Sequence, residues 1–63
     1  MTRAQLENAI NLRTRVYRKR GRVMIEVVTD DIDVLMRFPY AGMGNNVAEA
    51  VHSFIKAHKI QVQ

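Results

Sequence analysis

The sequence predicts a small α+β domain in the order helix, strand, strand, helix, with two helices packed on an antiparallel β-hairpin. Apolar residues recur at helical spacing over residues 3–20 and 46–59, and they occupy every second position over 23–27 and 32–38. These periods are typical of an amphipathic helix and of a strand with one buried face. The 63 residues fit one domain, 1–63, near the lower size limit for a self-sufficient core. An all-α oligomer is the alternative fold class.

The first helix is predicted over residues 3–20. Thr2 and Gln5 have the spacing of a capping box, in which each side chain bonds the backbone of the other residue. Cations at residues 18–20 would interact favourably with the negative, C-terminal end of the helix dipole. Gly21 suits the left-handed conformation that ends many helices. The apolar residues of this segment fall within about half of a helical wheel: Leu6, Ala9, Ile10, Leu12, Val16 and Tyr17.

The hairpin is predicted from residues 23–28 and 32–38, joined by a two-residue turn at Asp30 and Asp31. The turn lacks the glycine that two-residue turns prefer. A second interpretation therefore stays open, in which a short helix capped at residue 29 or 30 runs to Phe38. The hairpin register would place three pairs on one apolar face: Val27 with Val34, Ile25 with Met36, and Val23 with Phe38.

The second helix is predicted over residues 46–59, after a loop at residues 39–46. Asn45 or Asn46 can cap it, and Glu49 stands at the third helical position after Asn46. Residues 60–63 alternate and either add a short edge strand or fray. The core is predicted to form when both helices cover the inner face of the hairpin, through Leu6, Ile10, Val51 and Phe54.

Positive charge is concentrated in the first third of the chain. The formal net charge is +4, but residues 1–22 carry seven basic and one acidic side chain, whereas residues 23–63 carry three basic and five acidic ones. The positive potential is therefore predicted to be local. Six cations form the cluster: Arg13, Arg15, Arg18, Lys19, Arg20 and Arg22.

Four of these cations have i, i+3, i+4, i+7 spacing and would form one exposed stripe on the predicted helix. Such a stripe can follow phosphates, because neutralising them releases counterions. Tyr17 is the only aromatic residue nearby and belongs to the apolar side, so contact with a nucleic-acid backbone is predicted rather than base readout. A solvated helix end is the alternative. The stripe consists of Arg15, Arg18, Lys19 and Arg22.

The remaining motifs do not predict an enzyme, a cofactor or a metal site. The aspartates of residues 30–33 suit a solvated turn, and the glycines of residues 42–46 suit a loop before a helix cap. His52 and His58 lie on different faces of their helix, so they cannot form an i, i+4 ligand pair. The chain has no cysteine, which excludes disulfides and thiolate zinc sites.

The second face of the predicted hairpin is also apolar, which predicts an oligomer interface. A sheet washed by water on one side is normally more polar there. A domain this small often completes its core by self-association. The predicted interface consists of Met24, Val28 and Leu35.

No membrane partner is predicted. The longest apolar runs are far shorter than the roughly 20 residues that span a bilayer, and the N-terminal segment lacks the apolar core of a signal peptide. The sequence thus favours a cytoplasmic protein.

The Met1-Thr2-Arg3 start, the Gly21-Arg22-Val23 segment and the order of elements resemble the lambdoid head-to-tail joining proteins. The loop at residues 39–46 departs from their layout. The size of the chain is similar to that of the accessory proteins of the lambdoid exo-xis early region. These resemblances imply a phage-encoded protein in the host cytoplasm, either a regulator of lytic development or a virion component. Neither transfers a functional residue.

The sequence therefore predicts a small, non-enzymatic regulatory or accessory protein that binds nucleic acid or a host protein through its basic cluster. The alternative is a structural component whose basic end docks on an acidic protein surface. DNA, RNA and protein stay open as targets, as does the stoichiometry of the oligomer.

Overall fold

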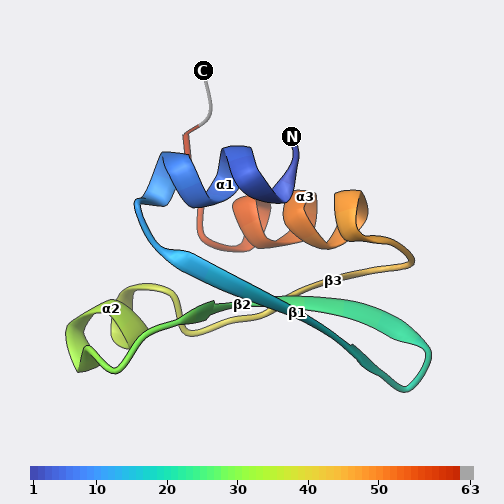
Figure 1. Cartoon of the computed structure of the whole chain (residues 1–63), viewed down its shortest axis with the longest axis horizontal. Helices are drawn as coiled ribbons and strands as arrows, with labels where there is room; N and C mark the ends of the chain where they lie inside the picture. Colours follow the sequence, from blue (N-terminus) through green and yellow to red (C-terminus); the bar gives the residue numbers. More distant parts are fainter. Residues whose placement is uncertain (62–63) are drawn as a thin grey trace.

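The computed structural model describes residues 1–61, which form three helices and one three-stranded antiparallel sheet (Figure 1). The strand order is β1-β2-β3, so β2 is central. Helices α1 and α3 lie together on one side of the sheet, and α2 lies at one end of the molecule (Figure 1). The predicted α+β class, with a hairpin flanked by helices, is confirmed. The elements are α1 Arg3–Ile10, β1 Arg13–Lys19, β2 Arg22–Val28, α2 Ile32–Arg37, β3 Gly42–Gly44 and α3 Val47–Ala57.

The first helix is shorter than predicted, because α1 ends at Ile10 and residues 13–19 form β1. The predicted capping box is present: the Thr2 N–H donates to Gln5 Oε1 at 2.8 Å, and the Gln5 N–H donates to Thr2 Oγ1 at 3.1 Å. Asn11 ends the helix in the left-handed conformation, with φ of 55°. The prediction of a helix over 3–20 is wrong because residues 13–19 also alternate at period two, and pairing with β2 satisfies their backbone.

The hairpin forms between β1 and β2, not between residues 23–28 and 32–38 as predicted. Lys19 pairs with Arg22, and the two turn residues Arg20 and Gly21 have φ of 53° and 78°. Two positive φ values are what a type I′ turn requires, and its twist matches that of the flanking strands. Gly21, expected to end a helix, instead serves this turn.

Residues 32–37 form α2, as in the interpretation left open beside the hairpin, although the cap is Asp31 and not residue 29 or 30. Asp31 caps this helix by accepting from the Asp33 N–H at 2.9 Å, and Thr29 Oγ1 accepts from the Asp31 N–H at 3.1 Å. An aspartate at this position satisfies a helix N-terminus better than it satisfies a tight hairpin turn. The predicted strand pairs of Val27 with Val34, Ile25 with Met36 and Val23 with Phe38 therefore do not form.

The core lies between the sheet and the two helices α1 and α3. The inner side of β2 is buried, as its alternation predicted, and Leu6, Val51 and Phe54 from the helices are fully buried. Ile10 is only partly buried at the margin. The core comprises Leu6, Val23, Ile25, Val27, Ala50, Val51 and Phe54.

Helix α3 packs directly on β3, which occupies part of the predicted 39–46 loop. A Cβ added to Gly42 would lie 2.1 Å from the Ala50 carbonyl oxygen, so the two backbones leave no room for a side chain there. The predicted Asn46 cap is confirmed, since its Oδ1 accepts from the Glu49 N–H at 2.9 Å. Residues 60 and 61 form no strand, and the remainder of the predicted 60–63 strand lies outside the described residues.

Thr14 joins α1 to β1 through a polar contact at the edge of the core. It is 4% exposed, its Oγ1 accepts from Arg3 Nε at 2.9 Å, and its N–H donates to Glu7 Oε2 at 2.6 Å. The pKa of Glu7 is lowered, first by that backbone hydrogen bond and also by the Thr14 hydroxyl, Arg3 and Arg13, against an opposing desolvation effect. Arg3 and Glu7 thus have structural partners.

Candidate nucleic-acid interface

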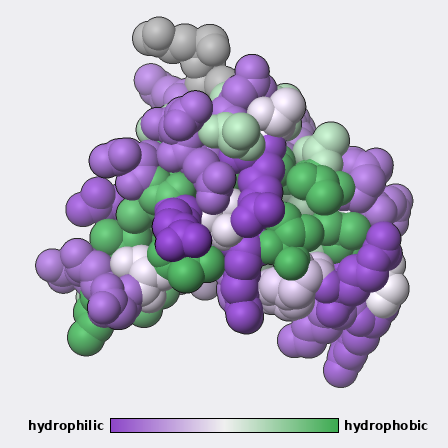
Figure 2. All heavy atoms as spheres, viewed as in Figure 1, coloured by the Kyte–Doolittle hydropathy of each residue, from purple (hydrophilic) through white to green (hydrophobic). Residues whose placement is uncertain are grey.

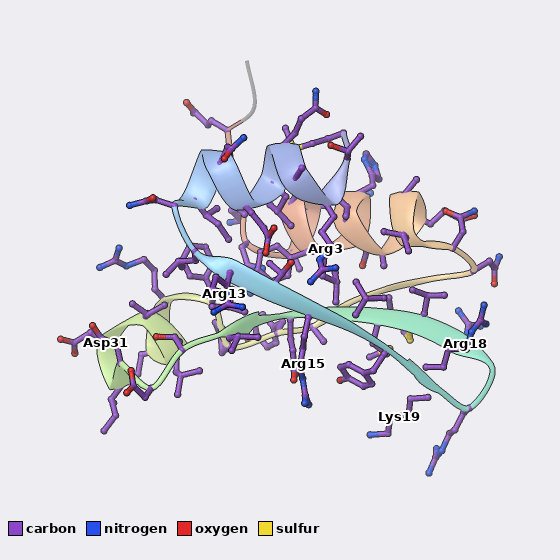
Figure 3. The ribbon with its side chains drawn as sticks, viewed as in Figure 1. Arg3, Arg13, Arg15, Arg18, Lys19 and Asp31 are labelled. Carbon is purple, nitrogen blue, oxygen red and sulfur yellow. The ribbon has the colours of Figure 1, made fainter. Side chains whose placement is uncertain are left out.

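The sheet has an outer face that points away from α1 and α3. Side chains on a strand alternate between the two faces, so every second residue of β1 and β2 lies there. Figure 3 shows Arg15 and Lys19 on the side of the sheet opposite the two helices. From the strand register, the outer face consists of Arg13, Arg15, Tyr17 and Lys19 on β1, Arg22, Met24, Glu26 and Val28 on β2, and Met43 on β3.

The predicted basic stripe does not exist in its helical form, because its residues lie on strands. Arg15, Lys19 and Arg22 nevertheless share the outer face. Arg18 points to the other face of the sheet, because it pairs with Val23 of the core. Its side chain is exposed there, near the end of the hairpin. Arg13 lies on the outer face at the other end of β1, and Arg20 is in the turn.

Arg15, Tyr17 and Glu26 form a small cluster in the middle of the outer face. Arg15 Nε is hydrogen-bonded to Glu26 Oε1, and Arg15 Cζ lies 5.1 Å from the centroid of the Tyr17 ring. The Arg15 side chain is 63% exposed, so this ion pair contributes at most about 1 kcal/mol to stability. Its clearer effect is to hold the guanidinium over the aromatic ring, a cation–π geometry.

The electrostatic balance of the outer face is positive. Glu26 is its only carboxylate and is paired with Arg15, the only ion pair within residues 1–61. Lys19 and Arg22 therefore have no ion-pair partner within residues 1–61, whereas Arg13 lies near the Glu7 carboxylate of α1. A hollow of about 300 Å³ lies at the hairpin end, where two methionines adjoin three cations. It is lined by Lys19, Arg20, Arg22, Met24 and Met43.

The residues predicted for an oligomer interface are divided between two places. Met24 and Val28 lie on the outer face, among the cations, and Val28 is 47% exposed. Leu35 was predicted on the same face but belongs to α2, where it is 44% exposed. The predicted binding and oligomer surfaces therefore overlap on the sheet, and only Leu35 stands apart from it.

Sequence reasoning missed two members of the outer face, Tyr17 and Met43. Tyr17 was assigned to a buried helix side because the segment was interpreted at period 3.6. Period two over residues 13–19 would have grouped its ring with Arg13, Arg15 and Lys19. Met43 carried no signal of its own, because it joins this face only when β3 pairs with β2.

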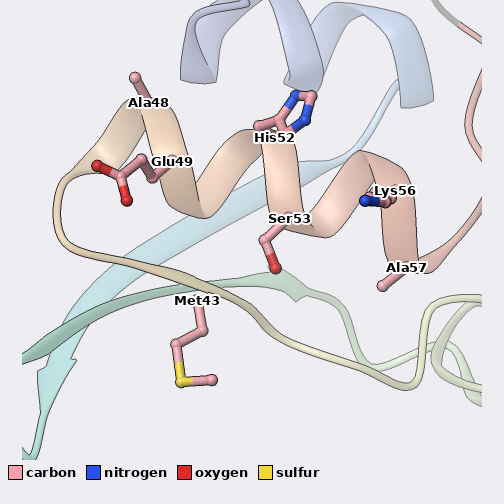
Figure 4. Close-up of a pocket in the computed structure, with 7 residues that line it drawn as sticks. All are labelled: Met43, Ala48, Glu49, His52, Ser53, Lys56 and Ala57. Atoms are coloured by element: carbon pink, nitrogen blue, oxygen red, sulfur yellow. The ribbon is translucent and has the colours of Figure 1, made fainter.

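A second, shallow hollow of about 620 Å³ lies between α3 and β3 (Figure 4). Its lining includes both an acidic and a basic side chain. Within the described residues, no group of three or more histidine, cysteine or acidic side chains could hold a metal ion. It is lined by Met43, Ala48, Glu49, His52, Ser53, Lys56 and Ala57.

His58 is occupied by structural contacts at the end of α3. Its Nδ1 lies 2.9 Å from the Phe54 carbonyl oxygen, and its Nε2 accepts from the Tyr40 N–H at 3.2 Å. These two bonds require the tautomer that carries its proton on Nδ1. His58 thus ties the segment after α2 to the end of α3.

Comparison with known protein families, with characterised proteins and with solved structures found no match to this chain. The resemblance to phage proteins therefore stays a prediction. In residues 1–61 no helix has both the length and the apolar character needed to cross a membrane.

Proposed function

We propose that the protein is a small, non-enzymatic regulatory or accessory protein that binds single-stranded nucleic acid on its outer face and hairpin end. One observation carries the proposal. Within residues 1–61 no helix covers the outer face, which combines four cations and one carboxylate with the partly exposed ring of Tyr17.

The cations suit contact with a phosphate backbone. Arg13, Arg15 and Lys19 are separated by two and four residues along β1, so they lie on the same face. Alternate residues of a strand lie about 7 Å apart. Arg22 continues this line across the turn, opposite Lys19. A chain of phosphates laid along β1 would release counterions on binding, so the affinity should fall steeply with salt.

The apolar groups of the outer face suit unpaired bases. Tyr17 lies between the cations, beside Met24 on the next strand, and Met24 in turn adjoins Met43. Proteins that bind single strands without strict sequence preference combine a basic groove with aromatic rings on which bases stack. In a duplex the faces of the bases are covered by their neighbours, so the ring adds little there.

The test is fluorescence anisotropy with a labelled 12-nucleotide single strand and its duplex, titrated over a range of salt concentrations. The single strand should bind more tightly than the duplex. Replacing Lys19 and Arg22 with Ala should lower the salt slope by roughly 0.7 for each phosphate that the variant no longer neutralises. Lys56→Ala, on α3, is the matched control and should leave the slope unchanged.

The contribution of Tyr17 is tested separately. Tyr17→Ala should weaken single-strand binding by roughly 5- to 150-fold, the equivalent of one stacked base, whereas Tyr17→Phe should retain most of the affinity. Undetectable binding of either nucleic acid at low salt would refute the proposal. The predicted docking on an acidic protein surface would then take its place.

A further inference from the structure

The three most exposed large hydrophobic side chains within residues 1–61 belong to helix α2 or follow it directly. None of its six residues is buried. Ile32 is 70% exposed, Met36 74% and Leu35 44%, and Tyr40 just after the helix is 63% exposed. These four residues are called the α2 patch. In Figure 2 hydrophobic atoms lie beside hydrophilic ones at this end of the molecule, a second hydrophobic area lies on the opposite side of the view, and the hairpin end is mainly hydrophilic.

The helix is anchored on one side only. Val34 and Phe38 pack against the core, and the Phe38 ring stacks on Phe54 with 6.0 Å between centroids. A helix of six residues has little intrinsic stability and depends on packing. The side turned to solvent is polar in most surface helices. Here it carries the α2 patch, which is typical of a protein interface.

The charges beside the α2 patch indicate what covers it. Asp33 and Arg37 are spaced i, i+4 and therefore lie on the same side of the helix, flanking Met36. Neither has an ion-pair partner within residues 1–61. Asp33 is in the first turn and Arg37 in the last, so the helix carries opposite charges at its two ends.

This arrangement is complementary to itself. When two copies of α2 pack antiparallel about a two-fold axis, Asp33 of one copy meets the partner's Arg37, and the reverse pair forms on the same side. The apolar residues Ile32 and Met36 then lie beside the two ion pairs, on the neighbouring strip of the helix surface. Two-fold interfaces use the same patch on both subunits, so a self-complementary patch is what such an interface needs.

We infer that the α2 patch is a homodimer interface, in which two copies of α2 pack antiparallel and exchange Asp33–Arg37 pairs. This inference does not depend on the proposed nucleic-acid binding. Helix α2 lies at the far end from the hairpin turn (Figure 1), so the dimer leaves both basic hairpin ends free. The patch is small beside a standard interface of about 800 Å² per partner, so the dimer forms reversibly as concentration rises.

Charge reversal tests the geometry directly. In sedimentation equilibrium of the full chain, the wild type should pass from monomer to dimer between roughly 10 µM and 1 mM. Asp33→Arg and Arg37→Asp should each stay monomeric, because each places like charges opposite one another. An equimolar mixture of these two variants should restore the dimer mass, since both mixed pairs are again attractive. The double variant D33R/R37D should also dimerise.

A charge reversal away from the patch serves as the control. Lys56→Asp, on α3, should dimerise like the wild type. Met36→Glu should reduce the dimer, and circular dichroism of each variant checks that the fold is retained, because the substituted residues are exposed. A wild type that stays monomeric throughout that range would overturn the inference. So would a dimer that responds to neither Met36→Glu nor the charge reversals.

Discussion

The two faces of the sheet differ in what covers them and in the kind of residue that they carry. On the inner face, β2 contributes Val23, Ile25 and Val27 to a core closed by α1 and α3. On the outer face, the same strand contributes Met24, Glu26 and Val28 to a surface rich in cations. Neighbouring residues of one strand thus lie in different environments. Substitutions on the inner face should change the free energy of unfolding, and those on the outer face should change binding.

The largest contrast is expected between the aromatic residues of the two faces. Phe54 is fully buried, and Phe54→Ala should cost about 3–5 kcal/mol, which is comparable with the whole stability of so small a domain. We expect this variant to be largely unfolded by circular dichroism at 25 °C. Tyr17→Ala should stay folded and bind single strands more weakly. A folded Phe54→Ala variant with a sharp thermal transition would contradict this view of the core.

A smaller contrast is expected between adjacent residues of β3. Gly42 faces α3, and a methyl group there would overlap the Ala50 carbonyl oxygen, so Gly42→Ala should cost about 1–3 kcal/mol through displacement of the helix. The expected fall in melting temperature is roughly 5–20 °C. Met43→Ala, on the outer face, should shift the melting temperature by less than about 4 °C. Equal shifts for the two variants would show that β3 does not separate the faces in this way.

The smallest effect concerns the Glu7–Thr14 contact at the edge of the inner face. Because the pKa of Glu7 is lowered in the folded protein, its carboxylate stabilises the fold at pH values above the usual glutamate pKa of about 4.3. This stabilisation disappears as the pH falls through the lowered pKa. Thermal melts of the wild type and Glu7→Gln should therefore differ most near neutral pH and converge in acid. Asn8→Asp, which changes the charge at an exposed position of α1, is the control and should not reproduce this pattern.

Local signals predicted the parts of the fold that depend on neighbours in the sequence. The Thr2–Gln5 capping box and the Asn46 cap are formed as predicted, because each needs residues only three apart. Helix α3 and the buried side of β2 followed from periodicity. The basic cluster was also predicted, since charge is a property of composition, and Arg15, Lys19 and Arg22 remain on one surface in the structure.

The partner of β2 could not be predicted from local signals. Residues 13–19 carry long cationic side chains that suit a helix or a strand, and their few apolar residues fit both periods. Asp30 and Asp31 offered a turn, but a two-residue hairpin turn with two positive φ values forms more readily at Arg20 and Gly21. Because the hairpin was predicted in the wrong place, Leu35 was assigned to a strand and not to α2. For the same reason Tyr17 was assigned to a helix and not to the outer face of the sheet.

The sequence by itself determined the caps, the amphipathic helix α3, the alternating strand β2 and the concentration of positive charge. Each of these is set by residues within a few positions of one another. Only the tertiary structure decided that β1 is a strand, that β3 joins the sheet, and that the cations share a face with Tyr17 and Met43. These features depend on hydrogen bonds and packing between segments distant in the chain, whose free energy exceeds the small local preference for helix over strand.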